Sequence, residues 1–430
     1  MIVRLLKNVN LFAKGDMIKM ENKGKIGYSY WGFLADYKFD SNGNFISTPD
    51  GNAFYSWCII KGLQDAGYDV LQVLSNRDKN YENLLRNKGI QDNTEMFNSW
   101  VTKDRVSAYN DMIHNNITNP IEGENIVMYR KRVYSEWDRI GLNNAVAVIH
   151  EWRMLIPGRN SISDYGKEGF QPDNILQDFL FDYCDMHNVP VILFDLDYKL
   201  TEADIARLSL TNKNLDVAIF ELGFKWYNLY RKSMHVEIPF DFSHIHDFDI
   251  VENPYVPFVY VGNRYERDYV VDKYIPDIQL ATLYGNWLES GRDSKERWPG
   301  IKFGPRLQTG EMHAVYSDAV ATILLAKQEY FKYNFMTARI IESVFYGCVP
   351  LFVEEYGLSA IERYAGIYAD MLTVASKDDV VKKIKYFSEN KKDRVNAIKY
   401  LRNHLAQMMD IKNFVHAVEY TIDKFNRNRW

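Results

Sequence analysis

The chain has 430 residues, of which 47% are hydrophobic and 25% charged, and its formal net charge at pH 7 is −5. This length exceeds one ordinary hydrophobic core, so we expect two domains. The acidic balance argues against a protein that coats nucleic acid non-specifically. No stretch is apolar enough to cross a membrane, and residues 1–25 lack the unbroken apolar core of a signal peptide.

The three cysteines, Cys58, Cys184 and Cys348, lie far apart and lack C-x-x-C spacing. This pattern indicates reduced structural thiols, which are typical of a cytoplasmic protein. The pair His244 and His246 has no further well-spaced ligands, so we expect no metal site there.

The first part of the chain predicts a βαβ unit. We expect a strand at 25–31, a polar loop over 32–52 and, after a helix that Gly67 closes, a second strand at 70–74. Asp50 or Asn52 caps the helix. The helix has its expected apolar face at Phe54, Trp57, Ile60 and Leu63. No G-x-G-x-x-G follows the first strand, which argues against a dinucleotide-binding dehydrogenase.

Three further apolar strands are each followed closely by an acidic residue. The runs 145–149, 189–194 and 216–220 precede Glu151, Asp195 and Glu221, respectively. Because ligands bind beyond the carboxyl ends of parallel strands, we expect one of these carboxylates at the site. The alternative for each is a helix cap or a turn.

Two stretches are rich in basic residues, 76–88 and 125–139. Each is either a solvated face, which is the usual role of a charge run, or a set of contacts to a phosphate backbone.

The second domain is expected to begin after a linker at 239–249, with a strand at Phe258 that turns at Gly262. Arg264 or Arg267 can bind a diphosphate, since arginine suits bidentate phosphate contacts. The alternative is a surface helix start in which Arg267 pairs with a neighbouring carboxylate. A strand is expected at 279–285. The apolar run 319–326 is either helix or strand, because periodicity does not separate the two over so short a run.

The stretch 333–357 predicts a helix followed by a buried strand at 348–353, with Gly347 ending the helix at positive φ. Arg339 and Glu342 lie three residues apart and therefore share one part of the helix surface. An intrahelical ion pair is one interpretation of these two residues.

The motif R-x-x-E, four residues and then G-C-V-P-L-F resembles the nucleotide-sugar signature of group 1 and CgeB-like glycosyltransferases of the GT-B fold. The resemblance implies an α/β protein of two Rossmann-like domains with parallel sheets, a cleft between them and a C-terminal helix that crosses back. It implies that Glu342 holds the donor ribose and that the helix N-terminus faces the diphosphate. The donor-binding residues expected from it are Gly262, Arg264, Arg267, Arg339 and Glu342. Asn334 replaces the first glutamate of the retaining pattern E-x7-E, which leaves the stereochemical outcome open.

This architecture divides the chain into an N-terminal acceptor domain (1–250), a C-terminal nucleotide-sugar domain (251–408) and a returning C-terminal helix (409–430). We expect a monomer. The donor is a nucleotide sugar, expected to be UDP-linked, and neither an organic cofactor nor a metal is required. An inverting enzyme needs a carboxylate base from the first domain. The candidates are Asp50, which we favour, Asp36 and Glu151.

The chain also resembles phage GT-B enzymes that glycosylate hydroxymethylated pyrimidines in duplex DNA, in its size and in its richness in Tyr and Asn. The favoured hypothesis is therefore transfer of a sugar to 5-hydroxymethylpyrimidine in double-stranded DNA, in the host cytoplasm if a phage encodes the protein. The first alternative is a transferase acting on a cell-surface, spore or protein glycan. The second is a nucleotide-sugar epimerase or a non-enzymatic nucleotide- or glycan-binding module.

Overall fold

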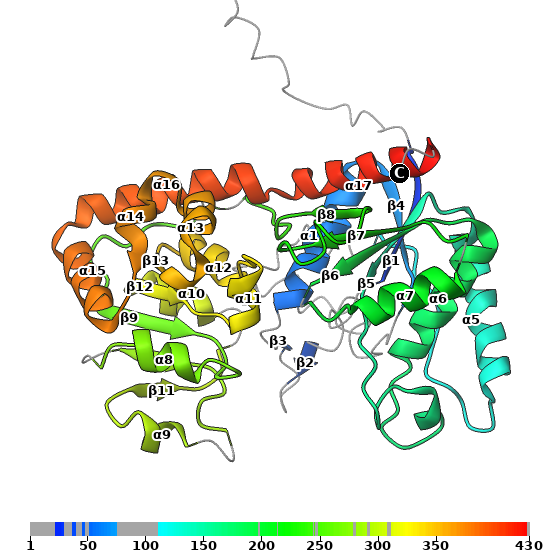
Figure 1. Ribbon diagram of the computed structural model, residues 1–430, viewed down its shortest axis with the longest axis horizontal. Coiled ribbons are helices and arrows are strands. Elements are labelled where there is room, and N and C mark those ends of the chain that lie inside the picture. The colour runs from blue at the N-terminus through cyan, green and yellow to red at the C-terminus, as the bar shows by residue number, and fades with distance from the viewer. Residues whose placement is uncertain are drawn as a thin grey trace, which may run out of the picture.

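The computed structural model has two α/β lobes, bridged along the top of Figure 1 by the helices α16 (Lys391–Met409) and α17 (Ile411–Asn426). The structure describes residues 22–29, 37–39, 45–47, 51–74, 111–196, 198–212, 214–243, 245, 248–277, 281–289, 293–307 and 311–427. Within these ranges, each lobe contains a parallel sheet covered by helices.

Six parallel strands form the sheet of the N-terminal lobe within the described ranges. In spatial order they are β4 (Tyr68–Gln72), β1 (Gly24–Ser29), β5 (Ala147–Glu151), β6 (Val191–Asp195), β7 (Val217–Glu221) and β8 (Ser233–His235). Strands β5, β6 and β7 are buried over their whole length, as expected for a parallel sheet with both faces covered. All three end on an acidic residue, as the sequence predicts.

The C-terminal lobe also has six parallel strands among the described residues. In spatial order they are β11 (Lys302–Gly304), β10 (Thr282–Tyr284), β9 (Val256–Val261), β12 (Ala319–Leu324), β13 (Val349–Val353) and β14 (Thr373–Val374). The ambiguous run 319–326 is thus a strand. All six residues of β12 are buried between β9 and β13, which removes the alternation that would have identified the strand.

Helices connect and cover the strands in both lobes. The N-terminal lobe contains α1 (Gly51–Asp65), α5 (Ile126–Ile140), η1 (Leu142–Asn144), η2 (Ile162–Asp164), α6 (Asp173–His187) and α7 (Glu202–Thr211). The C-terminal lobe contains α8 (Asp268–Tyr274), α9 (Ser294–Arg297), α10 (Glu311–Ser317), α11 (Gln328–Lys332), α12 (Arg339–Phe345), η4 (Glu354–Tyr356), α13 (Leu358–Ala365), η5 (Gly366–Tyr368), α14 (Ala369–Leu372) and α15 (Lys377–Glu389). A short antiparallel hairpin, β2 (Tyr37–Phe39) and β3 (Phe45–Ser47), lies within the predicted polar loop. None of the described helices is long and apolar enough to span a bilayer.

The basic run 125–139 is helix α5, which covers the N-terminal sheet. Asn125 begins it by accepting hydrogen bonds from the backbone N–H groups of Val127 and Met128. Its arginines form ion pairs within the lobe, such as Arg130 with Asp182 at 2.6 Å and Arg132 with Glu124 at 2.8 Å. The structure therefore shows these arginines bound to carboxylates of the lobe itself. The other basic run, 76–88, lies outside the described residues.

The C-terminal helix α17 returns to the N-terminal lobe and packs against α1. A Cβ atom on Gly62 of α1 would lie 2.4 Å from Cγ1 of Ile411, so the close approach of these helices requires glycine there. The turn between α16 and α17 is fixed by Phe240, whose N–H donates to Met409 O and whose carbonyl accepts from Ile411 N.

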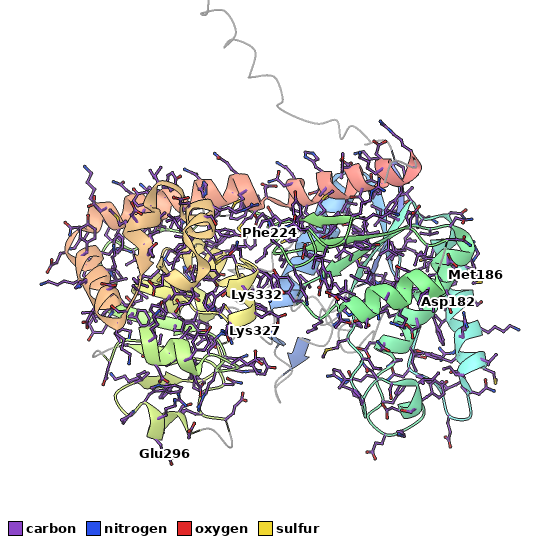
Figure 2. All side chains as sticks on the ribbon, viewed as in Figure 1. Asp182, Met186, Phe224, Glu296, Lys327 and Lys332 are labelled. Carbon is purple, nitrogen blue, oxygen red and sulfur yellow. The ribbon has the colours of Figure 1, made fainter. Side chains whose placement is uncertain are left out.

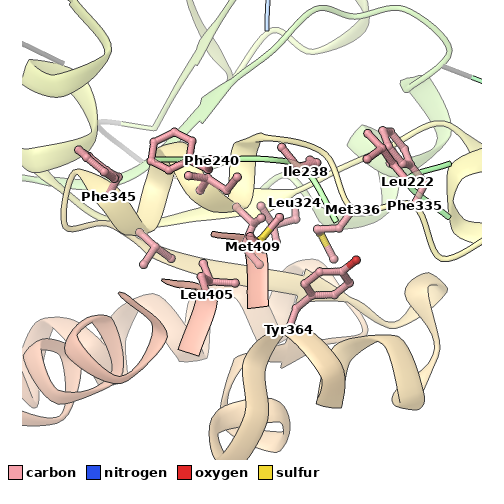
Figure 3. Close-up of a cluster of buried hydrophobic side chains, with 14 of the residues drawn as sticks. Leu222, Ile238, Phe240, Leu324, Phe335, Met336, Phe345, Tyr364, Leu405 and Met409 are labelled. Atoms are coloured by element: carbon pink, nitrogen blue, oxygen red, sulfur yellow. The ribbon is translucent and has the colours of Figure 1, made fainter. Parts of the chain in front are cut away.

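The two lobes meet through a continuous apolar cluster. Figure 3 shows Leu222, Ile238 and Phe240, from the end of the N-terminal lobe, against Leu324, Met336 and Phe345 of the C-terminal lobe and Leu405 and Met409 of α16. One backbone hydrogen bond also crosses the junction, from Phe224 N to Tyr333 O at 3.1 Å. Because Phe224 follows β7, this bond joins the carboxyl edge of the N-terminal sheet to the C-terminal lobe.

Candidate functional site

The strand order of the C-terminal sheet marks where a ligand is expected to bind. The chain leaves β9 toward β10 on one side and leaves β12 toward β13 on the other, so the order reverses between β9 and β12. In open α/β sheets, ligands bind beyond the carboxyl ends of the strands at such a reversal. We call the residues that follow these ends, Gly262 after β9 and Leu325 after β12, the switch-point edge.

Arg339, the first residue of α12, connects the two strand ends of the switch-point edge. Its Nε donates to the carbonyl oxygen of Val261 at 2.6 Å, and its Nη1 donates to that of Leu325 at 2.7 Å. The guanidinium lies over the Tyr260 ring, with Cζ 4.9 Å from the ring centroid. Arg339 is buried, so these contacts fix the relative position of the two strand ends.

Gly262 is required by the position of Arg339. A Cβ atom at residue 262 would lie 2.6 Å from Nη2 of Arg339 and 2.8 Å from the Tyr260 hydroxyl oxygen. No real Cβ contact is that short without a displacement of its neighbour. Glycine at position 262 therefore has a specific local reason, which is the guanidinium packed against it, and its predicted place beside the donor stays a prediction.

Glu342 lies one turn after Arg339 and is half-buried. Among the described residues its carboxylate has no hydrogen-bond or ion-pair partner, and it forms no ion pair with Arg339. Burial raises the pKa of Glu342, and the positive charge of Arg339 opposes that shift. An unengaged carboxylate that is held beside the switch-point edge can accept hydrogen bonds from two vicinal hydroxyl groups of a ligand.

The structure places Arg264 in a cluster of carboxylates. Its Nε and Nη2 donate to the two oxygens of Asp268 at 2.8 and 2.7 Å, and its Nη1 donates to Asp293 at 2.5 Å. These hydrogen bonds raise the pKa of Arg264 and lower that of Asp293. The guanidinium also lies over the Trp298 ring. Arg264 therefore braces the start of α8, and its positive charge is already balanced.

Arg267 has fewer charged partners than Arg264. Its Nη1 donates to the backbone carbonyls of Asn263 and Tyr265, at 3.0 and 2.9 Å, and it forms no ion pair among the described residues. Its buried Nε has no acceptor there either. The alternative in which Arg267 pairs with Glu266 or Asp268 is not seen; Asp268 pairs with Arg264 instead.

In the N-terminal lobe, Glu151 is fully engaged at the end of β5. One carboxylate oxygen accepts from the hydroxyls of Tyr28, at 3.1 Å, and Ser56, at 3.2 Å. The other oxygen pairs with Arg153 at 3.2 Å, and the residue is 2% exposed. Glu151 thus ties β1 and α1 to the end of β5. The other two candidate bases, Asp36 and Asp50, lie outside the described residues, as do His244 and His246.

The remaining strand-end carboxylates hold loops together. Asp195 accepts from Lys199 N at 2.9 Å and from the indole N–H of Trp226 at 3.3 Å, and burial raises its pKa to about 7. Glu221 accepts from Trp226 N, at 2.8 Å to its nearer oxygen, and from the Ser233 hydroxyl at 3.0 Å. For these two residues the structure shows the turn-forming alternative.

Lys327, which was not singled out from the sequence, lies two residues after Leu325 of the switch-point edge. Figure 2 labels Lys327 on the side of the C-terminal lobe that faces the N-terminal lobe. Its Nζ lies over the rings of Tyr330 and Tyr265, 4.7 and 5.9 Å from their centroids. Interpreting 319–326 as a strand would have placed Lys327 at a strand end, where ligands bind.

Two further features bear on the site. The described residues contain no group of three or more His, Cys, Asp or Glu side chains that could hold a metal ion, and metal independence stays a prediction. A cavity of about 940 Å³ is lined by residues of α1, α17 and the segment around Phe242. None of the candidate site residues lines it, so we do not assign the donor to it.

No protein-family model matches the chain, and no curated protein matches its sequence. Solved structures do match it. An alpha-glucosyltransferase in complex with UDP and a 13-mer DNA has a TM-score of 0.55 and 11% identity, covering 93% of this chain and 99% of that one. The DNA-modifying enzyme beta-glucosyltransferase, solved with and without uridine diphosphoglucose, has a TM-score of 0.52 and 12% identity, covering 93% and 99%. HepE of Anabaena, in complex with UDP-glucose, has a TM-score of 0.50 and 10% identity, covering 94% and 98%. The chain has the GT-B fold that the sequence predicts.

Proposed function

We propose that the protein is a glycosyltransferase that moves a sugar from a nucleotide sugar, expected to be UDP-linked, to an acceptor hydroxyl group. The observation that carries this proposal is Glu342, a half-buried carboxylate without a partner among the described residues, beside the switch-point edge of a GT-B fold. A ribose offers two adjacent hydroxyl groups, which match the two acceptor oxygens of this carboxylate. The solved structures named above include complexes with UDP or UDP-glucose, which supports the choice of donor.

In the proposed reaction, the bond between the anomeric carbon and the β-phosphate oxygen breaks, and its electron pair stays on that oxygen. The acceptor oxygen forms the new bond to the anomeric carbon and loses its proton. Arg267 contributes positive charge to the departing diphosphate, since its guanidinium has spare donor capacity. Arg339 acts as a positioning residue, because both of its observed hydrogen bonds to the strand ends are made to backbone carbonyls.

If the reaction inverts the sugar configuration, a carboxylate of the N-terminal lobe must accept the acceptor proton. Glu151 already accepts two hydroxyl groups and pairs with Arg153, so it is poorly placed to take part. We therefore assign this role to Asp50 ahead of Asp36; both precede α1 in the sequence.

For the acceptor, we propose 5-hydroxymethylpyrimidine in double-stranded DNA. The support is that two of the three structural neighbours above are a DNA-modifying enzyme and a glucosyltransferase bound to DNA. A glycan acceptor is the second candidate, because HepE in complex with UDP-glucose has the same fold at a similar TM-score, so the fold alone does not select DNA as the acceptor.

The test is intact mass spectrometry after incubation with a panel of nucleotide sugars. Duplex DNA containing hydroxymethylcytosine is expected to gain the mass of one hexose or pentose per modified base, and the same duplex with plain cytosine is the control. No gain with any donor would contradict the DNA acceptor. Release of free nucleotide or transfer to a glycan would then retain the transferase assignment, whereas an isomerised donor would indicate an epimerase. Binding without turnover would indicate a binding module.

A further inference from the structure

A departing diphosphate requires positive charge that carboxylates of the protein do not already balance. Arg264 is bound to two carboxylates, and Arg339 is bound to two backbone carbonyls. Helix α12 has only seven residues, so we assign no phosphate site to its N-terminus. Of the four cations near the switch-point edge, only Arg264 forms an ion pair with a described residue. Arg339 is buried and holds the two strand ends, which leaves Arg267 and Lys327 as the candidates.

Lys327 and Arg267 approach the same loop from two directions. The loop follows β9 and contains Tyr265, which is 58% exposed. Arg267 donates to the carbonyl oxygen of Tyr265, and the ammonium group of Lys327 lies over the Tyr265 ring. Lys327 itself follows β12, the strand on the other side of the strand-order reversal, and precedes α11. The two positive charges therefore come from the segments that follow the two strands between which a ligand is expected.

The contacts that Lys327 makes are ones that a phosphate group can replace. Its two aromatic neighbours hold the ammonium group by cation–π attraction, which is weak at exposed sites. A charge-assisted hydrogen bond from an ammonium group to a phosphate oxygen is stronger. The ammonium group also has three donors on a flexible stem, so it can turn toward a ligand without moving the backbone.

We propose that Lys327 binds the diphosphate of the nucleotide-sugar donor, opposite Arg267, and stabilises the negative charge that forms on the β-phosphate oxygen as the sugar departs. This inference rests on the proposed glycosyltransferase function. It assigns phosphate binding to a residue that lies outside both the R-x-x-E motif and the loop after β9. It also makes β12 a contributor to catalysis as well as to the core.

The test compares UDP with uridine, because uridine lacks the phosphates but keeps the base and ribose. Affinities are measured by calorimetry for UDP and by ligand-detected NMR for uridine. Lys327→Ala is expected to weaken UDP by about 10- to 100-fold and to leave uridine unchanged within about 2-fold. Lys327→Arg is expected to recover most of the UDP affinity. Lys332→Ala, on the same helix-bearing segment and also labelled in Figure 2, is the matched control and should bind UDP as the wild type does.

Unchanged UDP affinity in Lys327→Ala would overturn the inference. Equal losses for UDP and uridine would also overturn it, because they would indicate a disturbed site and not a lost phosphate contact. A wild-type protein that binds no UDP, and no other nucleoside diphosphate from a panel, would instead contradict the proposed function on which the inference depends.

Discussion

Arg339 and Val261 are 78 residues apart in the sequence, yet the Nε of Arg339 donates to the carbonyl oxygen of Val261 over 2.6 Å. The same guanidinium bonds the carbonyl of Leu325, so a single side chain joins the ends of β9 and β12. The R-x-x-E motif therefore combines two tasks. Its arginine holds together the two strand ends at the proposed donor site, and its glutamate remains available to the ligand.

Arg339→Ala is expected to destabilise the protein by about 2–4 kcal/mol, because it leaves two buried carbonyl groups without a donor. Arg339→Lys keeps the charge but lacks the planar fork that reaches both carbonyls, so it should lose most of the same stability. Urea unfolding and UDP affinity measure both effects. A lysine variant as stable as the wild type, with the same UDP affinity, would show that the fork is not needed.

Gly262→Ala is expected to cost about 1–3 kcal/mol, because the new methyl group would force the Arg339 guanidinium or the Tyr260 ring to move. The displaced guanidinium should also lower UDP affinity. In the double variant with Arg339→Ala, the alanine at residue 262 should cost less, since one of the two clashing groups is gone and the Tyr260 ring has room to move. If the stability costs of Gly262→Ala and Arg339→Ala simply add in the double variant, the proposed clash between residue 262 and the Arg339 guanidinium is contradicted.

Asp195 should make the stability depend on pH. Burial raises its pKa from 3.8 to about 7, so between these values the folded chain holds a proton that the unfolded chain has released. The stabilising effect of that proton is present below pH 3.8 and is lost as the pH rises toward 7. Relative to Asp195→Asn, the wild type should lose up to about 1.4 kcal/mol of unfolding free energy per pH unit across this window. A constant difference between the two proteins from pH 4.5 to 8 would contradict the raised pKa.

Two of the three candidate bases, Asp50 and Glu151, predict different kinetic effects. Asp50→Asn is expected to lower kcat by about 10²- to 10⁴-fold with little change in UDP affinity, as loss of a general base does. Glu151→Gln should lower stability through its hydroxyl and arginine contacts and leave kcat within about 10-fold. The reverse ranking of the two kcat values would assign the base to Glu151. An unchanged kcat in both would fit a retaining reaction or a role for Asp36.

Local patterns in the sequence were enough to predict much of the fold. Five of the six strands of the N-terminal sheet, β13, and Gly347 with its φ of +83° follow from apolar runs, β-branched residues and turn chemistry. The short strand β8 was not predicted. The strand β12 could not be distinguished from helix because both of its faces are buried. The basic run at 125–139 was not recognised as a helix; only its partners Asp182 and Glu124 show how its arginines are used.

Candidate site residues could be proposed from the sequence where the motif is local, but not where the contacts join distant residues. Glu342 and Arg339 were proposed from one short stretch, and their roles in donor binding stay predictions. Arg264 is bound by Asp268, four residues away, and by Asp293, 29 residues away, and no spacing rule connects Asp293 to it. Lys327 was missed because its significance depends on the strand order of the whole sheet.

The most direct test of the account is the affinity of UDP compared with its analogue lacking both ribose hydroxyls, measured by calorimetry in wild type and Glu342→Ala. If Glu342 holds the ribose, the wild type should bind UDP about 10- to 100-fold more tightly than the analogue, because hydrogen bonds to a carboxylate are strong. The variant should bind both ligands equally, at close to the weaker affinity. A variant that binds UDP as tightly as the wild type would contradict the assignment of the donor site.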